Sequence, residues 1–585
     1  MSQRAFALDP IIKAPGQLPP AWAEQLVQCT VDDSVNLPAV AVLAFRDPDH
    51  DLLTDTGITI GTPLEVSVTT VKDNSQLPLF SGEIIGLETE YDETGTFTVL
   101  RAADRAHRLM RRRRVLAFRN MTAADIVRRV AAKAGLTVGK VRAPGATYQQ
   151  ISQANVTDWE FLQALAAEHG AVVRVDDQGR LDFTEPDPAS KAPSPRSSAR
   201  LNPLVLQYGE NLLSLRAVLS TAEQVDSVTV RGWDVTTKRP VVARARAATS
   251  KTVLAGMSSG QSSHRFGGAG ELLVTDGAYR TQAEVDTAAK AQATAASAGF
   301  GEVEAVCEGN PHLRAGVPVA LANVGPSFSG RYTASASHHV FEPGNGYRTT
   351  VTVSGGEDRS VAGLAAPAAP EPPRIPGLAI GVVTDVKETP ARGRGWVKLR
   401  FPWLSDDYVT DWVRTVQLGG ARGGGVFSPD VNDEVLVGFE QGLLDKPYVL
   451  GGLYNGVDLP SPHDVPLVDP TSGRVNRRSF ATRSGDRVEL LDARGGPRGV
   501  RLRSGDGKLE VNLDRQGTSV IVHSDGTVQI EAARNVQITG RGVVVDAGAG
   551  DLALRGRTVS VSGRAGVSID GGTSASVRAA IVRIN

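Results

Sequence analysis

The stretch that decides the fold is residues 378–456, which holds four short runs separated by turns. They read Leu378-Ala-Ile-Gly-Val-Val-Thr-Asp-Val386, Gly395-Trp-Val-Lys-Leu-Arg-Phe-Pro-Trp-Leu-Ser-Asp-Asp407, Asp433-Glu-Val-Leu-Val-Gly-Phe-Glu440 and Lys446-Pro-Tyr-Val-Leu-Gly-Gly-Leu-Tyr-Asn-Gly456. Apolar residues recur at alternate positions and Gly, Pro, Asp or Asn bounds each run, which is typical of half-buried strands joined by tight turns. About five strands in roughly eighty residues predict a small closed barrel of the OB type, because closure removes exposed strand edges.

The composition bounds the class of protein. The chain has 585 residues and a formal net charge of -1 at pH 7, which predicts several domains and argues against a nucleic-acid binder. Gly is abundant at 62 residues and aromatic residues make up 5% of the chain, so many turns and short strands are expected. Cys29 and Cys307 lie in no metal-ligand spacing and are predicted to be buried free thiols. Residues 1–30 show no signal-peptide pattern.

Residues 1–360 are predicted to form a platform of two barrel-like subdomains with helices. Thr157 and Glu160 make a capping box at the start of one helix, and Gly170 stops it. The expected helices lie at residues 121–135, 155–170 and 281–296. Clean strand alternation marks residues 40–45, 64–71, 80–90 and 96–100.

The remaining boundaries follow from composition. A Pro- and Ala-rich linker is expected at residues 361–376, ahead of the OB barrel at residues 377–457. A connecting loop at residues 458–480 leads to a needle at residues 481–585. In the needle, apolar pairs two residues apart recur about every eight positions, which predicts a β-solenoid or a related winding. The pairs are Val520/Val522, Val528/Ile530, Val536/Ile538, Val543/Val545, Leu552/Leu554, Val559/Val561, Val567/Ile569, Ala575/Val577 and Val582/Ile584.

A single copy of this repeat is too thin to enclose a core. Eight residues supply one strand and one corner, or about a third of a turn, so nine pairs would give only a few coils. If three chains intertwine, each contributes one face at every level, and backbone hydrogen bonds run between subunits with no open edge. We therefore predict a homotrimer. The expected fold class is mainly β with a few helices: N-terminal β-barrel platform domains, an OB-fold barrel and a C-terminal intertwined triple-stranded β-helix.

Several runs of this sequence resemble one known family. In their order and spacing, the segments 400–407, 433–440 and 447–456 resemble the barrel of the VgrG family, the spike proteins of type VI secretion systems. That family is related to the central spikes of contractile phage tails and of extracellular contractile injection systems. The segments 79–87 and 153–162 resemble the N-terminal region of the same family. The motif residues of the OB barrel are Phe401, Pro402, Trp403, Tyr448, Gly451 and Gly452.

The resemblance implies a structural role. It implies the central spike of the baseplate of a contractile injection system, a homotrimer that links an Hcp-like inner tube ring to a membrane-piercing needle. It also implies a PAAR-repeat tip protein, baseplate proteins and effector cargo as partners, contact with a target membrane only on firing, and no nucleic acid. The tip contact is expected at Val582, Ile584 and Asn585. Assembly is expected in the bacterial cytoplasm as part of the particle, with release or delivery outside the cell as a later step.

No catalytic site, cofactor or metal site is expected. Gly256-Met-Ser-Ser-Gly260 matches the Gly-x-Ser-x-Gly string, but a nucleophile elbow needs a helix straight after it, and a Gly- and Ser-rich loop is expected there. His338 and His339 are adjacent, so on a strand they face opposite sides. Two alternatives stay open: a spike with cell-wall hydrolase or toxin activity, and an OB module that binds oligosaccharide or nucleic acid through Trp396, Trp403 and Trp412.

Overall fold

The computed structural model describes residues 7–584, apart from residues 72–73, 144–146, 177, 222–223, 264–269, 356–373, 390–392 and 422. The predicted linker at 361–376 therefore lies outside the described residues except for its last three. The chain divides into two compact units, residues 1–459 and residues 460–585, and each is described by itself. Among the described helices, none combines the length and the hydropathy needed to cross a bilayer.

The largest element of the first unit is an antiparallel ten-stranded sheet. Its core strands alternate buried and exposed positions, as in β3, where Ala41, Leu43 and Phe45 are fully buried. The pairing of β2 with β21 joins two segments that are far apart in the sequence. The strands, in spatial order, are β1 Ala7–Lys13, β4 Pro63–Thr70, β5 Gln76–Asp92, β6 Gly95–Asp104, β3 Val40–Arg46, β2 Leu26–Ser34, β21 Ala336–Glu342, β22 Gly346–Val353, β18 Gly301–Glu308 and β13 Leu212–Leu219.

Two capped helices lie between these strands in the sequence. Helix α3, Ala123–Lys133, begins after Thr122, whose side chain accepts a hydrogen bond from the Asp125 N–H. Helix α4, Asp158–His169, has the predicted capping box and ends at Gly170 in the left-handed conformation. Both helices share one apolar core with neighbouring short strands. Those strands are β7 Arg113–Met121, β8 Thr137–Val141, β9 Tyr148–Thr157, β10 Val172–Val175 and β11 Arg180–Thr184.

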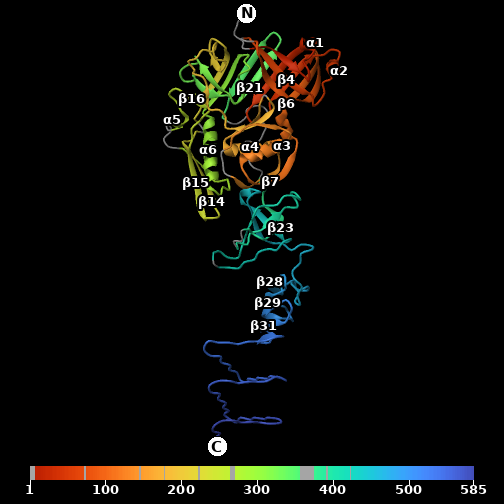
Figure 1. Cartoon of the computed structure of the whole chain (residues 1–585), viewed down its shortest axis with the longest axis vertical. Helices are drawn as coiled ribbons and strands as arrows, with labels where there is room; N and C mark the ends of the chain where they lie inside the picture. Colours follow the sequence, from red (N-terminus) through yellow and green to blue (C-terminus); the bar gives the residue numbers. More distant parts are fainter. Residues whose placement is uncertain are drawn as a thin grey trace. The chain divides into compact units, whose positions relative to one another are not determined.

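Two smaller sheets complete the platform. The third predicted helix, α6 Gln282–Ala298, packs along the hairpin of β14 Ser227–Asp234 and β15 Arg239–Arg246, which β17 Glu271–Val274 extends (Figure 1). Thr281 caps α6, again with a capping box. The other sheet contains β12 Val205–Gln207, β16 Thr252–Leu254, β19 Pro318–Ala322 and β20 Gly330–Thr333. The short helices are α1 Pro20–Ala23, α2 Leu52–Thr56 and α5 Ser259–Ser263.

The stretch that opened the sequence analysis forms a five-stranded sheet. Phe401, Val435 and Val437 are fully buried in its core. The β7–β9 hairpin of the platform packs Val115 and Ala154 against this core, and the Ser152 and Tyr408 hydroxyls lie 2.8 Å apart. The strands are β23 Leu378–Asp385, β24 Lys398–Arg400, β25 Arg414–Thr415, β26 Glu434–Phe439 and β27 Pro447–Gly452. The protein is thus mainly β with a few helices, as predicted.

Candidate assembly surface

The second unit begins with a five-stranded antiparallel sheet, which we call the neck sheet. Because directly paired residues point to the same face, its register aligns two rows of side chains across all the strands. Most of these apolar side chains are half or more exposed. The strands are β28 Arg477–Ala481, β29 Arg487–Asp492, β30 Arg498–Arg503, β31 Leu509–Asp514 and β32 Ser519–Ser524. The rows are Phe480–Val488–Leu502–Val511–Val522 and Arg478–Leu490–Val500–Leu513–Val520.

The opposite face of the neck sheet is polar and covered. Residues 460–476, which we call the strap, bring His463 and Asp464 onto Glu489 and Arg501. Arg501 donates to Glu489 at 2.6 Å and to both Asp464 oxygens at 2.7 and 2.9 Å. His463 Nδ1 accepts the Val465 N–H at 2.7 Å, so its Nε2 donates to Glu489. The Glu489 side chain is fully buried.

These contacts decide the charge state of the cluster. Burial pushes the pKa of Glu489 up, but hydrogen bonds from Arg501 and His463 outweigh it and hold the pKa below its usual range. The Arg501 guanidinium likewise holds the pKa of Asp464 below its usual range. Sequence reasoning missed this cluster. Its signal is the alternation of Arg487 and Glu489 with apolar residues along β29. With its polar face satisfied, the neck sheet has only its apolar face left unpartnered.

After β32 the chain changes character. Residues 527–584, which we call the needle segment, contain no helix or strand, and none of them is buried. Figure 1 shows this segment as a coil whose extended rungs follow one another. Within it, the backbone hydrogen bonds outside regular structure are those of two tight turns, from Gly550 to Ala547 and from Ser574 to Gly571. The rungs are extended chain without a ladder to neighbouring rungs.

The two turns are copies of each other. In one, the Gly548 N–H bonds to Asp546 and the glycine has a φ of 53°. In the other, the Gly572 N–H bonds to Asp570 and the φ is 50°. The two glycines are 24 residues apart, so the winding repeats after three octads. The sequence predicted about a third of a turn for each octad, and this spacing agrees with it.

The structure leaves the predicted needle residues accessible. The first member of each pair from Val528 to Val567 is 53–57% exposed, so the octads share one local conformation. Exposed together are Val528, Ile530, Val536, Ile538, Leu552, Leu554, Val559, Val561, Val567 and Ile569. At the end of the chain Val582 and Ile584 are also exposed, whereas Asn585 lies outside the described residues.

Val520 and Val522 differ from that expectation. They were predicted to open the winding repeat, but both lie on β32, which pairs antiparallel with β31 of the same chain. The short turn between these strands places Thr518 at a φ of 52° and lets β32 fold straight back. Alternate apolar positions fit a hairpin and a winding strand equally well, so the pattern alone does not separate them.

The OB motif residues separate into two groups. Phe401 is fully buried and stacks near Tyr408 at 5.9 Å, so it belongs to the core. Trp403 is half exposed, and its indole N–H donates to the Ile380 carbonyl at 2.8 Å. The Tyr448 hydroxyl donates to Glu440 at 2.7 Å. Pro402, Gly451 and Gly452 are exposed.

The other predicted tryptophans are half-buried under cations. Arg394 lies 3.5 Å from the ring centre of Trp396, and Lys398 lies 4.8 Å from that of Trp412.

The candidate catalytic and metal residues are structural where the structure describes them. The prediction of a loop after Ser258 is wrong, because α5 begins at Ser259. The Ser258 Oγ accepts the Gln261 N–H at 3.3 Å, as a helix-capping residue does. His338 faces Asp32 and His339 is buried against Tyr347, so the two rings point to opposite sides. Within the described parts of the chain, no three His, Cys, Asp or Glu side chains converge as metal ligands do.

Two family models match the chain. Residues 21–342 match the model described as the Alg8 N-terminal domain. Residues 379–454 match the type VI secretion system/phage-baseplate injector OB domain. The second match covers the five-stranded sheet of β23–β27 almost from end to end, and it confirms the predicted OB barrel.

Curated relatives come from Pseudomonas aeruginosa. The type VI secretion system spike protein VgrG5 is 32% identical over 177 residues, which are 29% of this chain and 21% of the relative. The spike protein VgrG2a is 34% identical over 101 residues, which are 16% of this chain and 12% of the relative. The matches thus span about a fifth or less of the length of these relatives.

Solved structures show a similar chain path. A chain of the half-lidded Francisella PdpA-VgrG complex covers 89% of this chain and 88% of its own length, at 10% identity and a TM-score of 0.49. An E. coli component of the type VI secretion system, itself similar to T4 bacteriophage tail proteins, covers 74% of this chain and 97% of its own length. It is 13% identical, with a TM-score of 0.46.

The fold and these matches define an injector-type protein with an OB domain between a large platform and an exposed winding segment. The Alg8 N-terminal domain spans more than half of the chain, so the chain belongs to the family that this domain defines, and with its injector OB domain and its VgrG relatives it is a VgrG-family spike protein.

Proposed function

We propose that this protein is the central spike of the baseplate of a contractile injection system and that it works as a homotrimer. The needle segment carries the proposal. It presents apolar pairs at a fixed spacing, and it contains no ladder of backbone hydrogen bonds between its rungs. An extended chain whose peptide groups and apolar side chains lack partners gains both when it braids with other copies.

Copies of the same chain are the occupants that fit best. The winding repeats after three octads, so two further copies would supply the strands between successive rungs of the first. The apolar rows of the neck sheet would meet the same rows of its neighbours, because a three-fold axis brings identical surfaces together. The strap keeps the polar face of the neck sheet turned away from that axis.

The mechanical role follows from this architecture. The platform would dock an Hcp-like inner tube ring and other baseplate proteins, and the braided needle would carry a PAAR-type tip protein at Val582, Ile584 and Asn585. Contraction would drive the needle through a target membrane, with effector cargo moving along with it. No bond is made or broken in this mechanism. The particle would assemble in the bacterial cytoplasm and act outside the cell.

The mass of the purified protein tests the proposal. One chain has a mass of 61.7 kDa, so light scattering coupled to gel filtration should report about 185 kDa, three times that value. A chain shortened after Ser524 lacks the needle segment and should dissociate at higher concentrations than the full chain. A full-length protein that stays at the mass of one chain at micromolar concentration would rule out the proposed function.

A further inference from the structure

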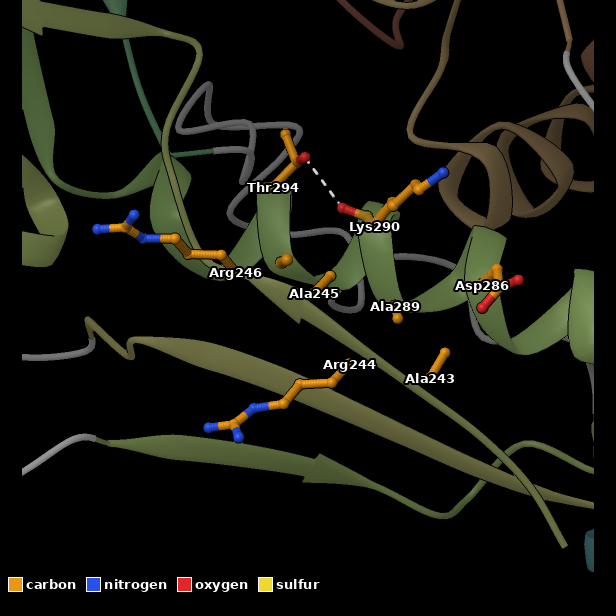
Figure 2. A pocket seen from close by; sticks show the side chains of 9 residues that line it. Ala243, Arg244, Ala245, Arg246, Asp286, Ala289, Lys290 and Thr294 are labelled. Atoms are coloured by element: carbon orange, nitrogen blue, oxygen red, sulfur yellow. Dashed lines mark hydrogen bonds between the residues drawn. The ribbon is translucent and has the colours of Figure 1, made fainter.

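A groove runs between the outer strand β15 and helix α6 in the platform (Figure 2). Its volume is about 350 Å³. Its floor is made of alanines, and charged side chains stand at its rim. β15 is the end strand of the sheet β15-β14-β17, so only one of its two edges is paired within that sheet. The lining residues are Ala243, Arg244, Ala245 and Arg246 from β15, and Asp286, Ala289, Lys290, Ala293 and Thr294 from α6.

The register shows which backbone groups face the groove. The Ala247 N–H donates to the Asp226 carbonyl at 2.9 Å, so the odd-numbered residues of this run bond toward β14. The even-numbered residues therefore turn their N–H and C=O groups to the free edge. The Gln282 side chain of α6 already donates to one of these groups, the Val242 carbonyl, at 3.0 Å. Beyond that contact, no described residue bonds to the edge-facing backbone groups of Arg244 and Arg246.

The side chains divide between two faces. Ala243 and Ala245 face α6, whereas Arg244 and Arg246 are exposed on the other side, and Figure 2 shows their guanidinium groups extending in one direction. Arg244 donates to the Ser227 hydroxyl at 2.9 Å and lies 3.7 Å from Glu271. Arg246 makes no ion pair with any residue in the described part of the chain. Three cations thus line the groove against one carboxylate, Asp286.

We propose that the free edge of β15 binds an extended acidic peptide of a partner protein as an added strand. Residues of the added strand that point to the outer face would be acidic, because Arg244 and Arg246 lie opposite them. Residues that point to α6 would be small and apolar, because Ala289 and Ala293 leave room only for short side chains. The Gln282 contact closes one end of the groove, so the paired run is about four residues long. This inference does not depend on the proposed spike function.

A defined peptide tests the proposal on the full-length protein. The probe is fluorescein-labelled Glu-Val-Glu-Val-Glu-Val with blocked ends, and fluorescence anisotropy measures its binding at low salt. The matched control peptide has Lys in place of each Glu and should not bind. The double variant Arg244→Glu/Arg246→Glu should weaken binding of the probe at least tenfold. Arg216→Glu on β13, an exposed arginine on the edge strand of the ten-stranded sheet, should leave binding unchanged.

A second variant tests the backbone contact separately. Arg244→Pro removes an N–H that points to the free edge and leaves the ladder with β14 intact, so the protein should fold with unchanged circular dichroism. The probe should no longer bind to this variant. Equal binding to Arg244→Pro or to the double charge reversal would overturn the proposal. Cross-linking that places a second copy of this chain over the edge in the assembled protein would also overturn it.

Discussion

At the scale of the residue, the buried ion cluster beneath the strap should control the stability of the second unit. Arg501→Met leaves the fully buried Glu489 with fewer donors, so we expect a loss of about 3 kcal/mol in the free energy of unfolding of that unit. Arg498→Met on the same strand is the matched control. Its carboxylate partner Asp492 lies 3.9 Å away and is exposed, so the loss should stay below about 1 kcal/mol. Urea unfolding of both variants measures the difference.

The same cluster predicts an acid limit. The folded-state pKa values of Glu489 and Asp464 lie below their ordinary values of 4.5 and 3.8. A lowered carboxylate pKa adds stability that is fully present above the unfolded value and is lost as the pH falls toward the folded value. The melting temperature of the second unit should therefore be constant near neutral pH and fall below about pH 4.5. In Glu489→Gln this fall should be smaller. An equal acid response of variant and native protein would contradict the assignment.

Phe401 in the OB barrel gives a third test. Its ring is fully buried among Tyr408, Trp403 and Phe439, and its truncation to alanine leaves a cavity. Phe401→Ala should lower the free energy of unfolding of the first unit by about 3–5 kcal/mol. Trp403→Ala in the same motif should cost much less, because that side chain is half exposed. Chemical denaturation monitored by circular dichroism compares the two. Similar losses would mean that the motif acts through a contact outside one chain.

At the scale of the element, the needle segment offers neighbouring valines with opposite expected roles. Val543 belongs to an apolar pair, and Val544 is 90% exposed between the members of that pair. Successive residues of an extended chain point to opposite sides, so Val543 should face the axis of the proposed trimer and Val544 the solvent. Val543→Asp should lower the temperature at which the trimer dissociates by many degrees, whereas Val544→Asp should change it little. Dissociation on heating in mild detergent measures both, and equal effects would refute the assigned faces.

Local signals explain which elements the sequence could predict. Thr157, Glu160 and Gly170 lie within one helix, so capping chemistry alone predicts where α4 begins and ends. The pairing of β2 with β21 joins segments about three hundred residues apart, and alternation within a strand carries no information about its distant neighbour. The strap cluster escaped for the same reason, because His463 and Arg501 meet only after the neck sheet has formed.

At the scale of the whole molecule, the two units should unfold separately. Each has its own buried cluster, with the large cores in residues 1–459 and a small one around Val465 and Leu491 in residues 460–585. Calorimetry of the full chain should therefore show two transitions. A chain that ends at Ser524 should keep the first transition unchanged and lose or lower only the second. One transition that shifts as a whole would contradict this independence.

The matching turns at Gly548 and Gly572 have a consequence for how such a shaft changes size. Since each full circuit of the chain restores the same local geometry, a block of 24 residues can be cut out or duplicated without disturbing what lies on either side. Reach would then be inherited in whole steps, and evolution could lengthen or shorten the instrument by copying a cassette rather than by redesigning its interior.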